Sequence, residues 1–183
     1  MIEIKCTGRG GQGAVTFSQI LAMAAFEEGF PVVQAMPTFG VERRGAPSFS
    51  FTRLSKEQCF GIRSQIYKPD IVIILDPSLL EDIDATKGLK KKGKLIINTN
   101  KNPKKLKTKG DYDVYTVDAS AVASKIFKKD IVNTAMLGAF AHATKIVSLK
   151  SLNKGIEQRF EGNKKLIDLN KKAVKEVYDK LKA

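Results

Sequence analysis

Apolar residues recur along this chain in short runs that alternate with polar turns, and many of the runs have the length and composition of strands. Strands are predicted at Ile2–Cys6, Pro31–Gln34, Ser48–Leu54, Ile71–Leu75, Lys94–Asn98 and Val114–Val117, with a further short one at Cys59–Ile62. Residues 71–75 are continuously apolar, which is typical of a strand buried on both faces of a parallel sheet.

Helical patterns fill intervals between these strands. Helices are predicted at Ala14–Glu28, from Pro77 or Ser78 to about Lys90, and from an N-cap at Asp118 to Phe127. Because strands and helices alternate at this spacing, we expect an α/β fold with a mostly parallel, Rossmann-like sheet and helices on both faces.

The last third of the chain is predicted to be helical. Asn133–Lys145 has apolar and small residues on almost every side of the predicted helix. This pattern indicates a helix buried on more than one side, by the core or by another subunit. Two amphipathic stripes follow: Leu149, Leu152, Ile156 and Phe160 in one, and Leu166, Leu169, Ala173, Val177 and Leu181 in the other. With 183 residues and no internal repeat, the chain is expected to form a single domain, residues 1–183.

The composition is typical of a soluble globular protein, with 43% hydrophobic and 28% charged residues. The longest apolar run is far too short to span a bilayer, and the N-terminus lacks a basic-then-apolar signal region, so we expect a cytoplasmic protein without membrane contact. Cys6 and Cys59 share no C-x-x-C spacing and cannot by themselves hold an iron–sulfur cluster. We therefore expect two buried thiols and no metal site.

The net charge of +13 is concentrated in one stretch, because thirteen lysines and three aspartates lie between Lys87 and Lys129. A basic face of this kind can be simply solvated, or it can bind an acidic protein or nucleic acid. The basic residues of the stretch are all lysines, without interleaved aromatics or a recognised nucleic-acid motif. We favour a solvated face, keep an acidic protein partner as the alternative, and expect no nucleic acid.

Candidate chemistry begins at the first turn, between a predicted strand and a predicted helix. The turn reads Gly8, Arg9, Gly10, Gly11, Gln12 and Gly13. Here a G-x-G-x-x-G spacing predicts a phosphate-cradling loop, since glycines let the backbone approach a ligand and free N–H groups at the helix start point at the anion. The alternative is that the glycines only allow close helix–sheet packing. No acidic residue ends the second strand to hold a ribose, which disfavours ordinary NAD binding.

A long loop between Gln34 and Pro47, rich in proline and glycine, is the second candidate segment. Its candidate residues are Phe39, Gly40, Glu42, Arg43, Arg44 and Gly45. Adjacent arginines suit bidentate capture of a carboxylate or phosphate. The alternative is a salt-bridged loop held against a neighbouring subunit.

The residues do not form a complete set of catalytic groups. The single histidine, His142, has no carboxylate at helical spacing beside it, and we expect a core or interface residue. No G-x-S-x-G, H-E-x-x-H or Walker-type pattern occurs. The residues by themselves predict a binding module without catalytic residues of its own.

The two motifs, in this order, closely resemble those of the gamma subunit of pyruvate:ferredoxin oxidoreductase (pyruvate synthase), a 2-oxoacid:ferredoxin oxidoreductase. The resemblance is carried by residues 8–16 and 37–47, by Asn133–Ala139, and by Ser148–Leu152 ahead of Arg159 and Phe160. The loop at 39–47 is closer to the pyruvate type than to the Tyr-Gly-Pro-Glu-Met-Arg-Gly-Gly type of 2-oxoglutarate enzymes. Ser48 departs from the family pattern, which often has an apolar residue there.

The resemblance implies a complex with alpha, beta and delta subunits that interconverts pyruvate and coenzyme A with acetyl-CoA and CO2, using ferredoxin as electron carrier. It implies that thiamine diphosphate and 4Fe-4S clusters sit in the partner subunits. This chain would then contribute to the coenzyme A side of the reaction at Gly8–Gly13, or to assembly. The alternatives are a 2-oxoglutarate or 2-ketoisovalerate oxidoreductase, a purely scaffolding subunit, and a free-standing nucleotide-binding protein.

Overall fold

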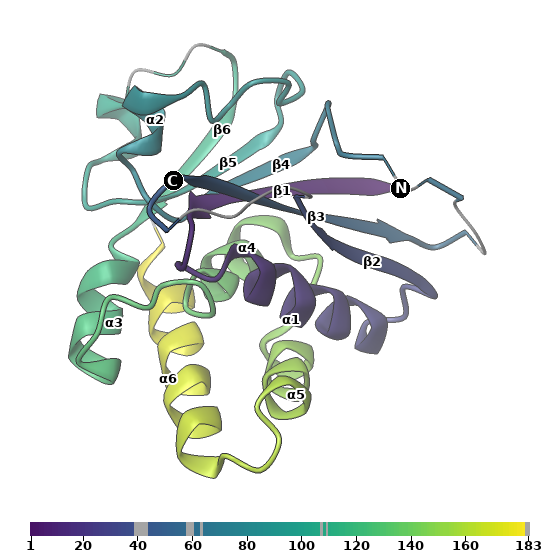
Figure 1. The fold of residues 1–183 in the computed structure, drawn as a ribbon, viewed down its shortest axis with the longest axis vertical. Coiled ribbons are helices and arrows are strands. Elements are labelled where there is room, and N and C mark those ends of the chain that lie inside the picture. Colours follow the sequence, from purple (N-terminus) through teal and green to yellow (C-terminus); the bar gives the residue numbers. More distant parts are fainter. Residues whose placement is uncertain (39–43, 58–60, 63, 107, 109, 182–183) are drawn as a thin grey trace.

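The computed structural model describes residues 1–38, 44–57, 61–62, 64–106, 108 and 110–181, and within these a single six-stranded sheet runs through the molecule (Figure 1). The strands are β1 (Ile2–Arg9), β2 (Val32–Pro37), β3 (Pro47–Ser55), β4 (Ile71–Ile74), β5 (Lys94–Asn98) and β6 (Asp113–Val117). Their order across the sheet is β2-β3-β1-β4-β5-β6. The strands β1, β4, β5 and β6 are parallel, whereas β3 pairs antiparallel with both β1 and β2. The predicted mostly parallel α/β sheet is confirmed, with an antiparallel pair at one edge.

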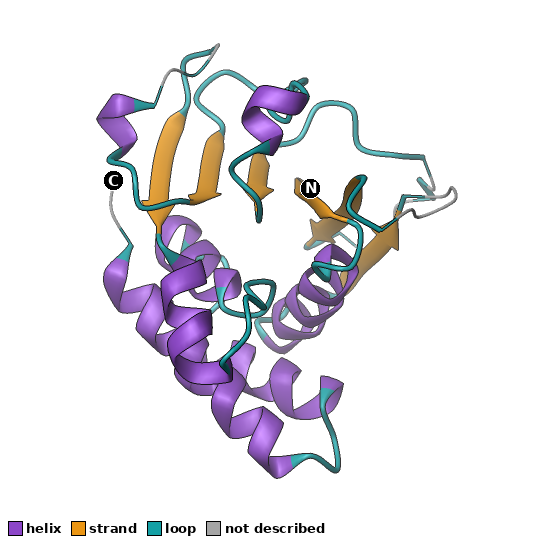
Figure 2. Cartoon of the chain, turned by 60° about the vertical axis from the view of Figure 1, so that its left-hand side comes forward, coloured by secondary structure: helices purple, strands orange, loops and turns teal. Residues whose placement is uncertain are grey.

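The helices are distributed unequally over the two faces of the sheet. They are α1 (Ala14–Glu27), α2 (Leu79–Asp82), α3 (Ala119–Phe127), α4 (Met136–Thr144), α5 (Leu149–Arg159) and α6 (Lys164–Lys180), with a 3-10 turn at Pro103–Lys105. Five of these six α-helices lie together below the sheet, and α2 lies on the other side (Figures 1 and 2). Helices therefore occur on both faces, but among the described residues the second face has only this four-residue helix.

The short α2 corrects the prediction of a helix from Pro77 or Ser78 to Lys90. After Asp82 the chain continues through turns, and Gly88 has a φ of +85°. A Cβ at Gly88 would lie 2.0 Å from the carbonyl oxygen of Tyr67, so the chain turns here against a neighbouring segment. The helix itself ends at Asp82, because Ile83 adopts an extended backbone with φ −141° and ψ 159°, and Gly88 marks a later turn. Of the strand expected at Cys59–Ile62, Cys59 and Phe60 lie outside the described residues, and Gly61 and Ile62 are not in a strand.

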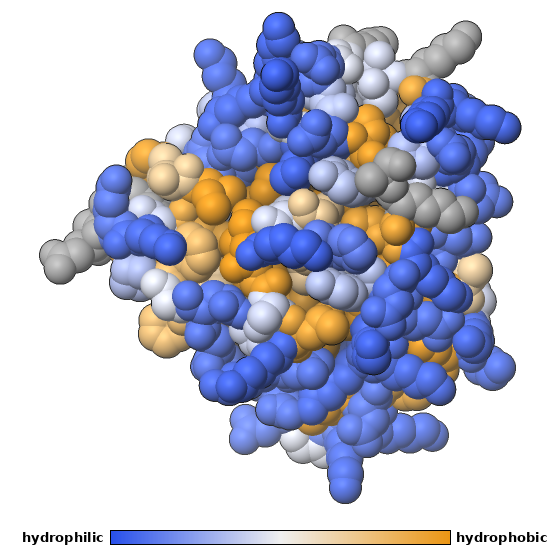
Figure 3. Space-filling model, turned by 180° about the vertical axis from the view of Figure 1, so that it is seen from behind, coloured by the Kyte–Doolittle hydropathy of each residue, from blue (hydrophilic) through white to orange (hydrophobic). Residues whose placement is uncertain are grey.

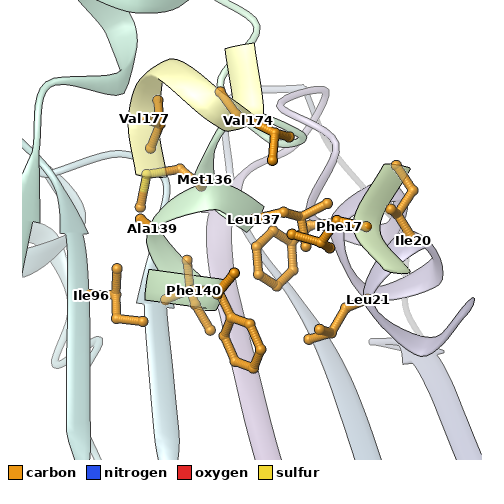
Figure 4. Packing of buried hydrophobic residues seen from close by; sticks show 14 of the residues in the cluster. Phe17, Ile20, Leu21, Ile96, Met136, Leu137, Ala139, Phe140, Val174 and Val177 are labelled. Atoms are coloured by element: carbon orange, nitrogen blue, oxygen red, sulfur yellow. The ribbon is translucent and has the colours of Figure 1, made fainter. Parts of the chain in front are cut away.

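The main core lies between the sheet and the layer of five helices. Helix α4 is at its centre, and its residues from Met136 to Ala141 are all buried, as the sequence predicts. Phe140 of α4 meets Phe17 of α1 edge to face, with ring centroids 6.3 Å apart, and α6 covers the other side of α4 (Figure 4). This packing fixes the start of α1, and with it the glycine turn, against the sheet.

A smaller apolar cluster covers the second face of the sheet. It consists of Val72, Ile74, Leu79, Ala85, Leu89, Leu95 and Ile97. These residues come from β4, β5 and the segment around α2, so the cover lies over the parallel strands. Among the described residues, no helix combines the length and apolar composition needed to cross a membrane.

Candidate site at the glycine turn

The glycine turn lies at the edge of the sheet where the parallel strands end. Strand β1 extends through Gly8 and Arg9, three residues beyond the predicted end at Cys6, and α1 begins at Ala14. The turn is therefore the segment from Gly10 to Gly13. The predicted order of strand, glycine turn and helix, in which a G-x-G-x-x-G spacing indicates a phosphate-binding loop, is confirmed. The carboxyl edge of a sheet is also where α/β proteins usually bind ligands.

Several backbone amides of the turn are free to meet an anion. Gly10 N donates to Ala46 O at 2.8 Å and Gln12 N donates to Arg9 O at 2.9 Å. The first helical bond of α1 runs from Phe17 N to Gly13 O, and Gly13 provides no side-chain cap. Within the described residues, no acceptor engages the N–H groups of Gly11, Gly13 or residues 14–16. Unpaired N–H groups at a helix start, aided by the helix dipole, favour an anion.

The Arg9 side chain is occupied by the protein itself. Its guanidinium donates to Asp76 Oδ2 at 3.2 Å, to Ser78 Oγ at 2.5 Å, to Asp82 and to the carbonyl oxygen of Gly45 at 3.2 Å. The hydrogen bond that Arg9 donates to Asp82 raises the pKa of Arg9, with the charge of Asp76 acting in the same sense. Arg9 thus ties the turn to the connection after β4, and little of its donor capacity remains for a ligand.

The Gln12 side chain is likewise used within the turn. Its Oε1 accepts a hydrogen bond from Arg9 N at 2.7 Å, and its Nε2 donates to Asp76 Oδ2 at 3.1 Å. Partial burial opposes ionisation of Asp76, but hydrogen bonds from Ser78 and Gln12 and the charge of Arg9 outweigh it and lower the pKa of Asp76. An ionised Asp76 is therefore the common acceptor that holds the turn together.

The glycines of the turn have different roles. Gly13 has a φ of +82°, and a Cβ there would lie 2.1 Å from Asn133 Nδ2, which donates to Gly13 O at 3.4 Å. A Cβ at Gly8 would lie 3.1 Å from Leu75 Cδ1. These two glycines fit the packing interpretation. Gly11, in contrast, is exposed, and a Cβ there would meet only Arg44 Cγ at 4.0 Å.

The described part of the second motif, the loop that contains Arg44 and Gly45, lies beside the glycine turn. Gly45 N donates to Gly10 O at 3.2 Å, which continues the antiparallel pairing of β1 with β3 beyond Arg9 and Pro47. Arg44 is exposed and lies beside Gly11. The other predicted residues of this loop, Phe39, Gly40, Glu42 and Arg43, lie outside the described residues.

Sequence reasoning missed four residues that shape the turn, namely Asp76, Ser78, Asp82 and Asn133. Three of them follow β4, which is the parallel neighbour of β1. An Asp-Pro-Ser sequence directly after a buried strand was the available signal, since carboxyl ends of parallel strands meet at one edge. No local signal connects Asn133 with Gly13, because 120 residues separate them.

The remaining reactive groups are held in the interior or at helix contacts. His142 Nδ1 lies 2.6 Å from Tyr178 O, and the two rings are 4.8 Å apart between α4 and α6. Cys6 is buried, and burial raises the pKa of its thiol despite the Ser50 hydroxyl nearby. Among the described residues, no cluster of three or more His, Cys, Asp or Glu side chains could hold a metal ion. Cys59 lies outside these residues.

Comparison with known proteins covers nearly the whole chain. Residues 3–180 match the family model "Pyruvate ferredoxin/flavodoxin oxidoreductase". The pyruvate synthase subunit PorC of Methanocaldococcus jannaschii is 49% identical, over 99% of this chain and 97% of that protein. The pyruvate/ketoisovalerate oxidoreductases common subunit gamma of Thermococcus kodakarensis is 50% identical, over 98% of this chain and 97% of its own length.

A solved structure agrees with these relatives. The crystal structure of pyruvate oxidoreductase subunit PORC from Thermotoga maritima superposes with a TM-score of 0.84 at 38% identity, over 99% of this chain and 97% of that one. The predicted resemblance is therefore confirmed in both sequence and fold. The chain belongs to the pyruvate ferredoxin/flavodoxin oxidoreductase family, and over its whole length it is similar to the gamma, or PorC, subunits of these enzymes.

Proposed function

We propose that this chain is the gamma subunit of a pyruvate:ferredoxin oxidoreductase that interconverts pyruvate and coenzyme A with acetyl-CoA and CO2. The observation that carries this proposal is the full-length similarity to PorC and gamma subunits, at about half identical residues. The partners are the alpha, beta and delta subunits and ferredoxin. We place thiamine diphosphate and the iron–sulfur clusters in those partner subunits.

We further propose that the glycine turn receives a phosphate group of coenzyme A. The free N–H groups at Gly11, Gly13 and the start of α1 support this role, as does the exposed Arg44, whose Cγ lies near Gly11. Arg9 and Gln12 support it indirectly, because they hold the turn open through Asp76. The proposed anion-binding groups are thus Arg44 and the amides, and Arg9 is a positioning residue.

A scaffolding role is the second candidate, and the Arg9 contacts favour it. Most donors of Arg9 and both polar atoms of Gln12 are used inside the chain. A turn stabilised to this degree could also present a rigid surface to a neighbouring subunit. This role predicts loss of assembly, and not loss of coenzyme A affinity, when the exposed residues of the turn are changed.

The test is a coenzyme A titration of the assembled complex carrying Arg44→Ala. We expect the KM for coenzyme A to rise about tenfold while kcat stays nearly unchanged, since one hydrogen bond from a charged group contributes about 1.5–3 kcal/mol. Lys172→Ala, an exposed cation on α6, is the control and is expected to leave both constants unaltered. An unchanged coenzyme A affinity with intact pyruvate decarboxylation would reject the ligand role. Release of the chain from its partners would favour scaffolding.

The 2-oxo acid is proposed to be selected by other subunits. One relative is a gamma subunit common to pyruvate and ketoisovalerate oxidoreductases, so a gamma subunit of this type serves enzymes with two substrates. This supports a contribution from the present chain that does not depend on the side chain of the 2-oxo acid. Pyruvate remains the proposed substrate, because the PorC relatives are named as subunits of pyruvate synthase and pyruvate oxidoreductase.

A further inference from the structure

A hollow of about 570 Å³ lies on the face of the sheet that the five helices do not cover. Its floor consists of Lys5 from β1 and of Phe49 and Phe51 from β3. The connection before β4, at residues 65–67, and the turns after α2, at residues 83–87, form its walls. The volume is within the range of about 300–1,000 Å³ that is usual for binding pockets.

The sheet pairing explains why aromatic side chains lie in this hollow. Lys5 is paired directly with Phe51 in the antiparallel register of β1 and β3, so both point to the same face. The opposite face of these strands packs under α1, where Ile4 and Leu54 are buried. The cluster around α2 covers β4 and β5 and leaves the floor at β3 open.

Two lysines, Lys5 and Lys87, and one aspartate, Asp84, line the hollow. The Nζ atom of Lys5 lies 3.4 Å from the carbonyl oxygen of Ala85 and 4.9 Å from the centre of the Phe49 ring. Partial burial lowers the pKa of Lys5, and the nearby charge of Asp84 opposes this shift. In the described part of the chain, no carboxylate lies within 4.0 Å of this ammonium group, which has three donors. A carboxylate entering the hollow would meet an ammonium group whose contacts are the Ala85 carbonyl oxygen and the Phe49 ring, with Asp84 at the same wall.

The rim is unusually apolar for a surface. Tyr67, at one wall, is 74% exposed, and Ile62 in the same connection is 39% exposed. Elsewhere too, the face seen from behind has hydrophobic residues between hydrophilic side chains (Figure 3), so the exposed fractions of Tyr67 and Ile62 carry the argument here. Exposed aromatics beside a pocket are typical of the energetic centre of a protein interface. Lys87, exposed at the opposite wall, adds a second positive charge.

We propose that this hollow, lined by Lys5, Phe49, Phe51, Tyr67 and Lys87, docks a segment of another subunit of the same complex. The segment inserts an apolar or aromatic side chain against Phe49 and Phe51 and places a carboxylate against Lys5. Charge complementarity supports this occupant, because the two lysines of the lining outnumber its single aspartate, Asp84. The inference rests on the proposed gamma-subunit function, which supplies the partner polypeptides.

The test measures how tightly the full chain binds the remaining subunits, by sedimentation velocity and by anisotropy of a labelled chain. Tyr67→Ala is expected to raise the Kd at least tenfold, because truncating an interface aromatic is costly and its exposed ring contributes little to folding. Lys5→Gln is expected to raise the Kd and to flatten its dependence on salt. Phe26→Ala is the matched control, since Phe26 of α1 is 60% exposed and lies outside the hollow.

The possible outcomes separate the docking proposal from the proposed function. Unchanged Kd values for both hollow variants, or an equal rise for Phe26→Ala, would overturn the docking proposal alone. A wild-type chain that binds none of the other subunits would overturn the gamma-subunit function and the docking proposal with it. Self-association that is lost in Tyr67→Ala would assign the hollow to a second copy and reject the partner segment.

Hydrogen exchange provides a measurement that does not depend on variant folding. In the wild-type complex, amides at residues 65–67 and 83–87 are expected to exchange more slowly than in the isolated chain. Equal exchange in both states would overturn the proposal. A small carboxylic acid could instead slow exchange at these residues of the isolated wild-type chain. That result would identify the hollow as a ligand pocket and reject docking.

Discussion

Gly13 combines two requirements at one position, a left-handed backbone and the absence of a Cβ. Its φ is +82°, which costs a non-glycine residue about 1–2 kcal/mol, and Asn133 Nδ2 occupies the space beside its Cα. Gly29 has nearly the same φ, +84°, but no atom lies within 4 Å of the corresponding Cβ position. A comparison of substitutions at the two glycines therefore separates the cost of backbone strain from the cost of a steric clash.

We expect Gly13→Ala to lower the free energy of unfolding by about 2–4 kcal/mol and Gly29→Ala by about 1 kcal/mol. Both variants have the same backbone strain, and only the first must displace Asn133. Urea denaturation at neutral pH measures the two values. Equal losses would contradict the steric role of Asn133.

Asp76 is the residue whose charge should make stability depend on pH. Its pKa is lowered in the folded chain, so its contribution is present above the unfolded pKa of about 3.9 and is lost as the pH falls through the folded pKa. We expect Asp76→Asn to destabilise the chain most at pH 7, with a difference from the wild type that shrinks on acidification below about pH 4. Unfolding curves between pH 7 and pH 2.5 measure this difference.

The control for this prediction is Asp168→Asn on α6, an exposed aspartate for which no comparable change is expected. A difference between the wild type and Asp76→Asn that stays constant across the pH range would mean that Asp76 acts only by its shape. The ion pair with Arg9 would then contribute nothing measurable, as is common for exposed pairs.

At the scale of elements, the close crossing of α4 and α6 decides the position of the C-terminal third. A Cβ at Gly138 would lie 2.0 Å from the carbonyl oxygen of Val174, so the two helix backbones touch there. At Gly155 of α5, a Cβ would lie 3.0 Å from the carbonyl oxygen of Ile20 in α1. The first contact leaves no space for a methyl group, and the second nearly accommodates one.

We expect Gly138→Ala to cost about 3 kcal/mol and Gly155→Ala less than about 1.5 kcal/mol. The difference follows from the rigid carbonyl of α6, which cannot give way without moving the helix. Differential scanning calorimetry compares the two melting temperatures. A larger loss at Gly155 would show that the α1–α5 contact is the tighter one in solution.

Elements also show where local patterns stop being informative. The period-two alternation of β3 and the apolar run of β4 predicted both strands, because each pattern reflects the burial of its own faces. The composition after β4 suggested a helix to Lys90, yet α2 ends at Asp82. The extended backbone of Ile83 ends α2, and the later turn at Gly88 lies against Tyr67, in a separate connection of the chain.

For the whole molecule, the uneven cover of the sheet has the largest functional consequence. Five helices seal one face, whereas among the described residues α2 is the one α-helix on the second face (Figure 2). The second face also has the open hollow at β1 and β3. Tyr67, which is 74% exposed, lies at the rim of this hollow, where the docking proposal places the partner. The proposals for the glycine turn and for the hollow thus place two different kinds of partner on two parts of one subunit.

The amino-acid sequence by itself determined the α/β class, the glycine turn between β1 and α1, the buried α4 and the family. These features depend on periodicity, on turn-forming residues and on motif order, all of which are local. Only the tertiary structure decided that Arg9 binds Asp76 and Asp82, that Arg44 approaches Gly11, and that one face of β3 stays open. These contacts join segments 33 to 73 residues apart, and they arise from the order of strands in the sheet, which no local pattern encodes.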